Sequence, residues 1–152
     1  MQGSIPKFVC MIRLNLGCGD QILDGYTNCD LFNPLAEIQC DVAELPYKDG
    51  EVDEVYASHL IEHFDYYTAQ KLLKEWKRVL KEGGALVIET PDFLESCRKF
   101  ARLPEDQQIT MYGHFFAKPW LPGEVHKFLY THRELYGLLV DAGFMNISFE
   151  SP

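Results

Sequence analysis

The chain has no long apolar run and no repetitive segment. None of its 152 residues belongs to a stretch that approaches the ~20 consecutive apolar residues of a membrane-spanning helix. The N-terminus also lacks the basic and then apolar layout of a secretory signal. Internal repeats and low-complexity tracts are missing as well. We therefore expect a cytoplasmic chain without a membrane partner.

The chain lacks the cysteine spacing of a structural site. The chain has five cysteines, an odd number, and none of them forms a C-x-x-C pair. This pattern excludes a disulfide framework and a zinc ribbon, and it favours reduced thiols in the cytoplasm. The cysteines are Cys10, Cys18, Cys29, Cys40 and Cys97.

Basic residues are also in short supply. The 14 lysines and arginines are outnumbered by 23 acidic residues, which gives a formal net charge of −9. Because phosphate binding depends on clustered basic side chains, nucleic acid is an unlikely partner on this count. The segment 71–81 is locally basic, but Glu75 and Glu82 interrupt it at helical spacing, which favours a solvated helix face.

The remaining composition is that of an ordinary globular domain, with 47% hydrophobic and 24% charged residues. We expect one domain over residues 11–152, preceded by an irregular lead at residues 1–10. Strands are expected at 12–16, 26–29, 38–40, 52–57, 85–91 and 144–150, and helices at 68–80, 93–103 and 131–142.

This alternation predicts an α/β fold, namely a doubly wound, mostly parallel sheet of about six strands. Residues 22–25 leave almost no room between the first two strands, so the first crossover helix is expected to be reduced to a turn. Thr68 is the expected N-cap of the first long helix, and Gly83 and Gly84 are expected to end it. The strand 85–91 is apolar on both faces, which is typical of a central parallel strand.

Two glycines and several polar residues fall at predicted carboxyl ends of strands. Gly17 and Gly19 follow the first strand, Asp30 ends the second, Asp41 follows the third, and Ser58-His59 follows the fourth. Because ligands of doubly wound sheets bind at this edge, we expect these groups to converge on one crevice. Cys18, between the glycines, is expected to fill the loop with a small side chain rather than to act as a nucleophile.

The spacing disfavours a phosphate-binding loop. A third glycine is missing, no helix follows, and Asp30 comes eleven residues after Gly19 rather than about 20. A nucleoside without phosphates fits better. Asp30 would then bind a ribose, Asp41 would lie beside the base, and the open backbone at 17–19 would accept an amino-acid tail.

A competing motif follows the fourth strand. Residues 59–63 read H-x-x-E-H, a zinc-peptidase pattern that would use His59 and His63. A catalytic zinc ion needs a third protein ligand, and the sequence suggests no obvious one downstream. A zinc-dependent hydrolase is therefore a remote alternative, and no metal is expected. Glu62 and His63 are expected to orient the loop by hydrogen bonds.

The segment 104–126 is long, aromatic and predicted to be irregular, as substrate-side loops or lids often are. Tyr112, His114 and Trp120 are its candidate substrate-side residues, whereas Phe115 and Phe116 are expected to cover the sheet edge. His126 is the candidate general base, because a neutral imidazole near pH 7 can accept a proton. An ordinary loop histidine is the equal alternative.

Four stretches together resemble the successive motifs of class I S-adenosylmethionine-dependent methyltransferases. They are Leu-Asn-Leu-Gly-Cys-Gly at 14–19, Asp-Val-Ala-Glu-Leu-Pro-Tyr at 41–47, Ser-His-Leu-Ile-Glu-His-Phe at 58–64 and Arg-Val-Leu-Lys-Glu-Gly-Gly-Ala-Leu-Val-Ile at 78–88. Residues 135–144 also resemble the family's last helix. The short first loop is similar to that of a compact subgroup of predicted methyltransferases, some of them associated with polysaccharide pathways.

The resemblance implies a strand order of 3-2-1-4-5 followed by the last strand, and a site for S-adenosylmethionine. Gly17 and Gly19 would approach its methionine part, Asp30 its ribose, Asp41 and Val42 its adenine, and the Ser58-His59 backbone its amino group or sulfonium. Asn15 stands where the family usually has an acid, which removes a negative charge near the cofactor. The implied set is Asn15, Leu16, Gly17, Cys18, Gly19, Asp30, Leu31, Asp41, Val42, Ala43, Ser58 and His59.

The resulting hypothesis is methyl transfer from S-adenosylmethionine to a small-molecule or sugar-type acceptor. A cofactor- or nucleoside-binding module without catalysis is the main alternative, because the fold needs no invariant catalytic side chain. The sequence leaves the acceptor and the oligomeric state open.

Overall fold

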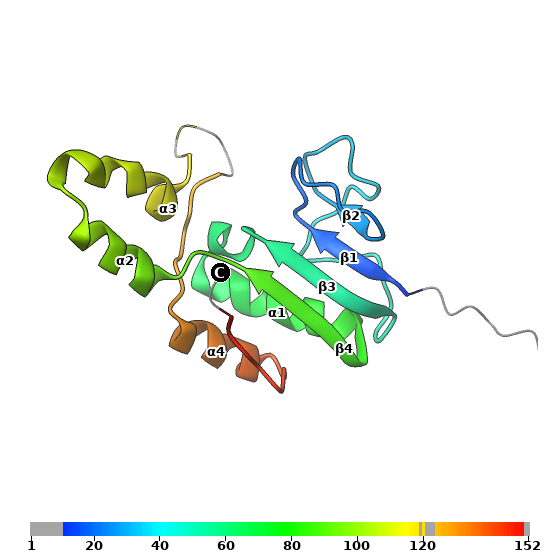
Figure 1. The fold of residues 1–152 in the computed structure, drawn as a ribbon. Helices are drawn as coiled ribbons and strands as arrows, with labels where there is room; N and C mark the ends of the chain where they lie inside the picture. Colours follow the sequence, from blue (N-terminus) through cyan, green and yellow to red (C-terminus); the bar gives the residue numbers. More distant parts are fainter. Residues whose placement is uncertain (1–10, 119, 121–123, 151–152) are drawn as a thin grey trace, which may run out of the picture.

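The computed structural model describes residues 11–118, 120 and 124–150, so the lead expected at 1–10 lies outside the described residues. A parallel sheet forms the centre of the molecule (Figure 1). It consists of β1 (Arg13–Leu16), β2 (Thr27–Cys29), β3 (Val52–Ser58) and β4 (Leu80–Glu89), in the order β2-β1-β3-β4.

One face of this sheet forms the core. Leu14 and Leu16 of β1 pair in register with Val55 and Ala57 of β3, and all four side chains are fully buried. The helix α1 (Tyr66–Val79) packs on them through its own buried stripe, which consists of Ala69, Leu72, Leu73, Trp76 and Val79. The period-two pattern of the strands and the 3.6-residue pattern of the helix therefore meet at one apolar layer.

The bounds of α1 differ from those expected. The helix begins at Tyr66 rather than at Thr68, because the Asp65 carboxylate accepts hydrogen bonds from the backbone N–H groups of Tyr67 and Thr68 and acts as the N-cap. It ends at Val79 and continues directly into β4, so the pair Gly83-Gly84 lies inside the strand and does not end the helix.

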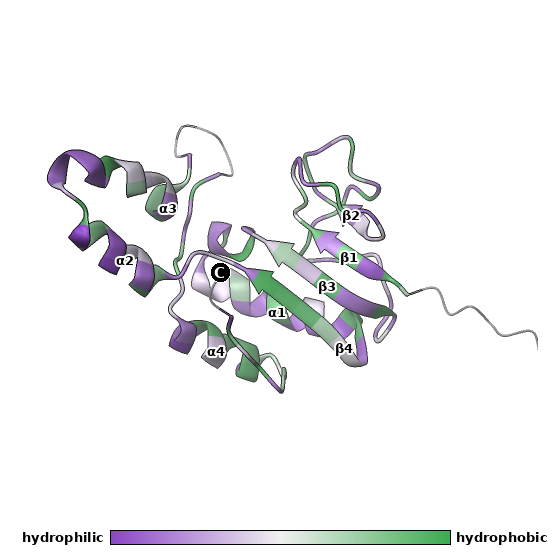
Figure 2. Cartoon of the chain, viewed as in Figure 1, coloured by the Kyte–Doolittle hydropathy of each residue, from purple (hydrophilic) through white to green (hydrophobic). Residues whose placement is uncertain are grey.

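The strand β4 is an edge strand among the described residues, not the central strand that its apolar sequence suggested. Figure 2 shows its second half as strongly hydrophobic. Leu86 and Ile88 pack against the core, but Val87 on the opposite face is 41% exposed. Apolarity on both faces is therefore not a sufficient sign of a central position.

Two further strands are not formed as expected. The third consists of a single parallel bridge between Ile38 and Cys29, so it lies beside β2. With that bridge the described order still follows the expected 3-2-1-4-5. Residues 144–150 form no strand, since they pair with no neighbour among the described residues. The sheet thus has four strands and one bridge rather than six strands.

The second half of the chain forms an arm and a return segment. The arm contains α2 (Phe93–Arg102), the 3₁₀ helix η2 (Glu105–Met111) and α3 (Tyr112–Phe116), and it extends away from the sheet in Figure 1. Much of the predicted irregular loop 104–126 is therefore helical. The return segment (residues 124–131) follows the arm, and a parallel bridge joins its Tyr130 to Asp92. It leads into α4 (His132–Asp141), which contacts α1.

Other expectations are confirmed. Residues 20–26 contain turns and no helix between β1 and β2. The last helix begins after Thr131, whose side chain forms a capping box with Glu134. Among the described residues, no helix combines the length and the apolar character of a membrane span.

Candidate functional site

The loop after β1 is a tight turn whose backbone is locally open. Gly17 and Gly19 both have positive φ angles, +60° and +46°. A Cβ atom on Gly17 would lie 2.5 Å from Leu60 Cδ1, whereas one on Gly19 would meet nothing within 4 Å. Between them the buried Cys18 donates its backbone N–H to the Cys29 carbonyl, at 3.1 Å. Burial raises the pKa of the Cys18 thiol, and the nearby Asp30 charge adds to this, which agrees with a filler rather than a nucleophile.

Asp30 lies directly beyond β2 and faces the same loop. Its Oδ2 accepts a hydrogen bond from the Gly19 N–H at 2.9 Å, and its Oδ1 accepts from the N–H groups of Phe32 and Asn33 at 2.7 and 2.8 Å. Partial burial alone would raise the pKa of Asp30, but the three N–H donors outweigh it and lower the pKa. Asp30 is thus held as a carboxylate against the glycine loop.

Asn15 lies within the sheet, and its side chain is only 3% exposed. Its amide donates to the Gln21 carbonyl and to Asn28 Oδ1, both at 2.8 Å. Asn28 Oδ1 in turn accepts from the Leu23 N–H. This buried amide pair connects β1 and β2 to the turn that replaces the crossover helix. Asn15 therefore stabilises the conformation of this turn.

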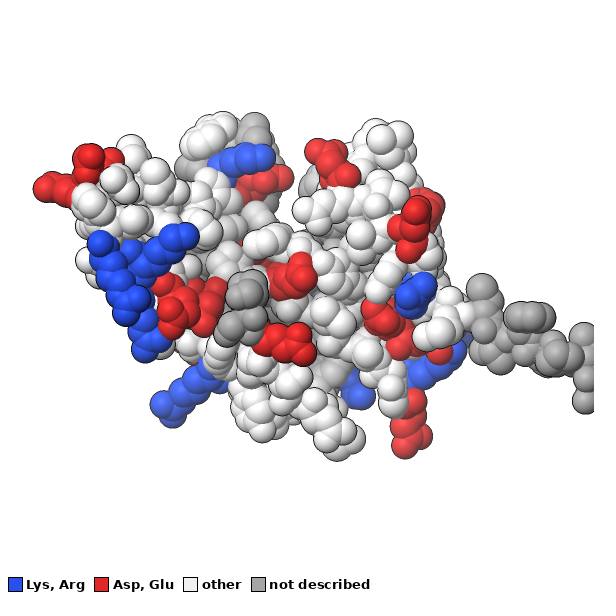
Figure 3. All heavy atoms as spheres, viewed as in Figure 1, with Lys and Arg blue, Asp and Glu red and all other residues white. Residues whose placement is uncertain are grey.

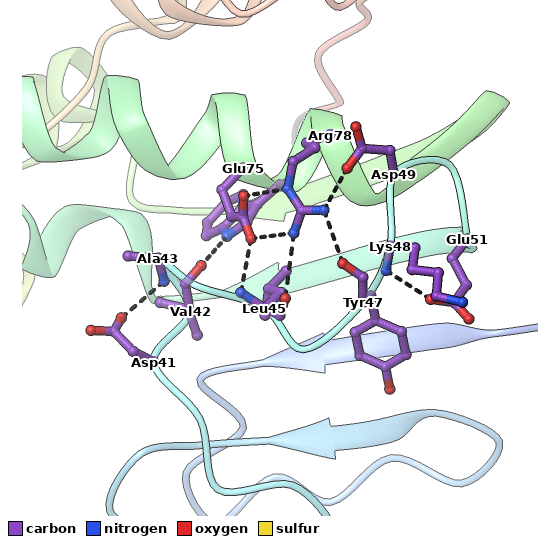
Figure 4. A network of polar contacts seen from close by, with 11 residues as sticks. Asp41, Val42, Ala43, Leu45, Tyr47, Lys48, Asp49, Glu51, Glu75 and Arg78 are labelled. Atoms are coloured by element: carbon purple, nitrogen blue, oxygen red, sulfur yellow. Dashed lines mark hydrogen bonds and ion pairs between the residues drawn. The ribbon is translucent and has the colours of Figure 1, made fainter.

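The loop that carries Asp41, Val42 and Ala43 is fixed to α1 by polar contacts (Figure 4). The buried Trp76 indole donates to the Val42 carbonyl at 3.0 Å. The Ala43 N–H donates to Asp41 Oδ1, and the carboxylate itself remains exposed. The loop of the adenine-side candidates is therefore held in place, with Val42 buried and Asp41 open to solvent.

Arg78 supports the rest of this loop from the last turn of α1. Its guanidinium donates to the carboxylates of Glu75 and Asp49 and to the carbonyls of Tyr47 and Leu45 (Figure 4). Hydrogen bonds from Arg78 lower the pKa of Glu75, so both partners stay charged. One arginine thereby satisfies two backbone acceptors that have no partner in a regular ladder.

At the end of β3, Ser58 and His59 flank the glycine loop. The Ser58 hydroxyl donates to Glu89 Oε2 at 2.8 Å, and the Tyr56 hydroxyl donates to the same oxygen at 2.7 Å. His59 has a φ angle of +49°, and its N–H donates to the Glu89 carbonyl. Glu89 therefore fixes the end of β3, a role that its position after an apolar strand did not predict.

A buried carboxylate and three histidines lie just beyond β3. Glu62, in the 3₁₀ helix η1 (Ile61–His63), is 0% exposed and contacts His59 Nδ1 at 3.1 Å. The rings of His63 and His126 pack edge to face, with centroids 5.0 Å apart. Ligand atoms of Glu62, His63 and His126 all lie within 4.8 Å of one another.

His126 is held in one orientation. Its Nδ1 lies 3.2 Å from the His114 carbonyl oxygen, to which it donates when protonated there. Burial lowers the pKa of His126, although Glu62 opposes this, so the ring is neutral near pH 7. The second ring nitrogen then carries a free lone pair, which can accept either a proton or a metal ion.

The zinc-peptidase geometry expected from H-x-x-E-H is not formed. Such a site needs two histidines one turn apart on a helix, but His59 precedes a three-residue 3₁₀ helix and is mainly solvent-exposed. The residues that converge are Glu62, His63 and His126. Sequence spacing missed this set because His126 is 63 positions from His63.

An aromatic cavity of about 410 Å³ adjoins His126. Its aromatic lining consists of Phe93, Phe115, Phe116 and Phe128. Other residues of the return segment and Glu134 of α4 complete the lining. Phe115 and Phe116, expected to cover the sheet edge, thus border a cavity between the arm and the return segment. No sequence signal had singled out Phe93 or Phe128.

The other substrate-side candidates lie around this cavity rather than in its lining. Tyr112 packs on Phe116, with ring centroids 6.0 Å apart, and His114 contributes its carbonyl to His126. Trp120 is exposed, as is Leu31 beyond β2. Figure 3 shows the surface hollowed between the loops around β2 and the segment that contains α3, while basic side chains gather over α2.

The chain matches a family model in sequence and solved structures in fold. Residues 23–88 match the model of the family described as "Methyltransferase domain". A SAM-dependent methyltransferase from Archaeoglobus fulgidus aligns with 21% identity and a TM-score of 0.62, over 91% of this chain and 62% of that one. A possible histamine N-methyltransferase from Thermotoga maritima aligns with 20% identity and a TM-score of 0.57, over 89% and 64%.

A third structure contains a bound ligand. Phosphoethanolamine N-methyltransferase 2 of Haemonchus contortus, in complex with S-adenosyl-L-methionine, aligns with 18% identity and a TM-score of 0.55, over 90% of this chain and 33% of that one. The chain thus spans less than two thirds of each of these relatives. No curated protein sequence matches it significantly. The resemblance to the methyltransferase family is confirmed, and so is the Rossmann-like fold.

Proposed function

We propose that this chain, a member of the class I methyltransferase family by its motif match and its fold, binds S-adenosylmethionine and transfers its methyl group to a small-molecule acceptor. The observation that carries the proposal is the contact between Asp30 and the Gly17–Gly19 loop. It places a charged acceptor and open backbone side by side at the carboxyl edge of the sheet, where such folds bind ligands.

The residues present fit this cofactor. Each carboxylate oxygen can accept about two hydrogen bonds. Among the described residues, Asp30 Oδ2 accepts one, from the Gly19 N–H, so it has a second acceptor position for a ribose hydroxyl. The space beside Gly19 is open for the amino-acid part. Asp41 offers an exposed carboxylate at the end of the neighbouring loop, where it can accept from an adenine amino group.

When bound, S-adenosylmethionine supplies an activated methyl group, so the protein needs no covalent intermediate. The tasks left to the chain are positioning and exclusion of water. The Ser58-His59 backbone, where the His59 N–H donates to the Glu89 carbonyl, would border the cofactor. The Leu60 side chain lies beside Gly17 of the glycine loop.

The aromatic cavity beside His126 is the acceptor site in this proposal. Phe93, Phe115, Phe116 and Phe128 provide apolar faces, while His126 and Glu134 provide polar edges. Rings of this kind stack on flat or apolar faces of small molecules, including one face of a sugar. Net negative charge and the small cavity volume favour such an acceptor over nucleic acid.

Calorimetric binding of S-adenosylmethionine tests the cofactor site. We expect Asp30→Asn to weaken binding by at least about 10-fold, because the loss of one charge-assisted hydrogen bond costs roughly 1.5–3 kcal/mol. Asp20→Asn is the matched control, since it removes an exposed carboxylate of the same loop, and it should change the affinity by less than about two-fold. Equal affinities of Asp30→Asn and the parent would contradict the assigned site.

Formation of S-adenosylhomocysteine with a panel of phenols, amines and sugars tests the transfer itself. Product that appears only with one acceptor class would support an enzyme and identify that class. Cofactor binding without product from any acceptor would favour the alternative, a binding module of the same fold.

A further inference from the structure

We propose that Glu62, His63 and His126 form a binding site for a divalent transition-metal ion such as Zn²⁺. The three side chains each offer a ligand atom, and these atoms lie within 4.8 Å of one another. In a tetrahedral zinc site with bonds of about 2.0–2.1 Å, ligand atoms are roughly 3.4 Å apart. Small side-chain rotations therefore suffice to close the set around an ion.

The buried charge of Glu62 is the first argument. Its side chain is 0% exposed, and no lysine or arginine among the described residues forms an ion pair with it. Its partners are His59 Nδ1 on one oxygen and the Thr90 hydroxyl, at 3.0 Å, on the other. A buried carboxyl group with so few polar partners is well suited to bind a cation, and a metal ion would supply that charge.

The orientation of His126 is the second argument. A histidine that binds a metal usually donates its other ring N–H to a carbonyl or carboxylate, which fixes the tautomer. The His126 Nδ1 has such a partner in the His114 carbonyl. Its Nε2 is then left as the donor of a lone pair.

The third argument is an unsatisfied nitrogen on His63. The Nδ1 atom of His63 is buried and has no hydrogen-bond partner in the part of the chain that the structure describes. A buried polar atom without a partner costs about 1–3 kcal/mol. Binding to a metal through a ring nitrogen, with reorientation of the ring, would remove this cost.

The backbone brings the three residues together. The Glu62 carbonyl accepts hydrogen bonds from the N–H groups of Lys127 and Phe128, at 2.8 and 3.2 Å. These bonds fix the return segment on η1, directly after His126. The cluster is thus part of the tertiary structure rather than a chance meeting of surface side chains.

Two imidazoles and one carboxylate suit a borderline divalent metal, and zinc is the most available of these for such a ligand set. Because His126 also borders the aromatic cavity, the ion would lie next to the proposed acceptor site. The metal site does not depend on the methyl-transfer proposal, and its test needs no cofactor.

The test is a Zn²⁺ titration of chelator-stripped protein in competition with a chromophoric chelator, accompanied by Co²⁺ absorption spectra. We expect one equivalent of Zn²⁺ to bind, and Co²⁺ to give the visible bands of a tetrahedral site. His126→Ala and Glu62→Gln should each lower the affinity by at least about 100-fold. His132→Gln is the matched control, because His132 belongs to a separate pair with Asp92 and should leave the affinity unchanged.

His126 lies in the return segment and is only partly buried, so His126→Ala should fold even if Glu62→Gln does not; circular dichroism and melting curves check this. Absence of stoichiometric binding to the parent would overturn the proposal, as would undiminished binding by folded His126→Ala. A metal-bound His126 cannot also accept a proton. Failure of the titration would leave the two sequence-based alternatives for His126, a general base or an ordinary loop histidine.

Discussion

At the scale of single residues, the loop after β1 is the most constrained part of the chain. Gly17 has a positive φ angle, and the Leu60 side chain occupies the space that a Cβ atom would need there, whereas Gly19 has the positive φ angle alone. The two glycines are thus used differently. Gly17 lets the loop close on the core, and Gly19 leaves space for a ligand.

We expect Gly17→Ala to lower the free energy of unfolding more than Gly19→Ala does. In both variants a Cβ atom in the left-handed region lowers the free energy of unfolding by about 1–2 kcal/mol. Only Gly17→Ala adds a clash with Leu60. Urea unfolding of the two variants measures the difference. Equal midpoints would show that the contact between Gly17 and Leu60 relaxes without cost.

At the scale of elements, α1 holds the loop 41–49 in place. Arg78 makes charged hydrogen bonds to four acceptors in or near this loop, and its side chain is 34% exposed. We expect Arg78→Met to destabilise the protein by roughly 2 kcal/mol, because charged hydrogen bonds contribute about 1.5–3 kcal/mol each and solvent screens this one in part.

Arg98→Met is the matched control for this prediction. In the part of the chain that the structure describes, Arg98 pairs with Glu95 alone, on the exposed surface of α2, and its side chain is 51% exposed. Such surface pairs contribute about 0–1 kcal/mol. Thermal unfolding of both variants is the measurement, and equal losses would contradict the role that we assign to Arg78.

At the scale of the whole molecule, hydrogen-bonded carboxylates make stability dependent on pH. Hydrogen-bond donors of the protein lower the pKa of five acids below the ordinary 3.8 or 4.5. These are Asp30, Asp53, Asp65, Glu75 and Glu89. Burial opposes this lowering at all five, and at Asp30 it is the largest single effect. A lowered folded-state pKa contributes stability above the unfolded-state value, and this contribution is lost as the pH falls through the folded-state value.

We therefore expect the melting temperature to change little between pH 7 and 5, where relief of the net charge of −9 also favours the folded state. Below about pH 4.5 it should fall steeply as these carboxylates protonate. Melting curves from pH 7 to pH 3 measure this dependence. A midpoint that is maintained at pH 3 would show that these hydrogen bonds contribute little to the stability.

Much of the fold, and part of the proposed cofactor site at the carboxyl ends of the strands, followed from the sequence alone. The apolar run into Gly17 and Gly19, the missing crossover helix and the start of the last helix at Thr131 or His132 are local patterns, and local patterns determine strands, turns and helix ends. The convergence of the glycine loop and Asp30 also followed, because the carboxyl ends of parallel strands meet at one edge.

Other features depended on contacts between distant residues. Which strand lies at the edge depends on pairing, so the apolar β4 could not be recognised as an edge strand from its own composition. The helices η2 and α3 of the arm were not predicted, because their polar and aromatic sequence has no clear helical pattern. The cluster of Glu62, His63 and His126 exists only because two backbone N–H groups after His126 bind the Glu62 carbonyl. Local periodicity in the sequence determined the strand ends that form the proposed cofactor site. Long-range hydrogen bonds in the tertiary structure decided which other side chains lie together.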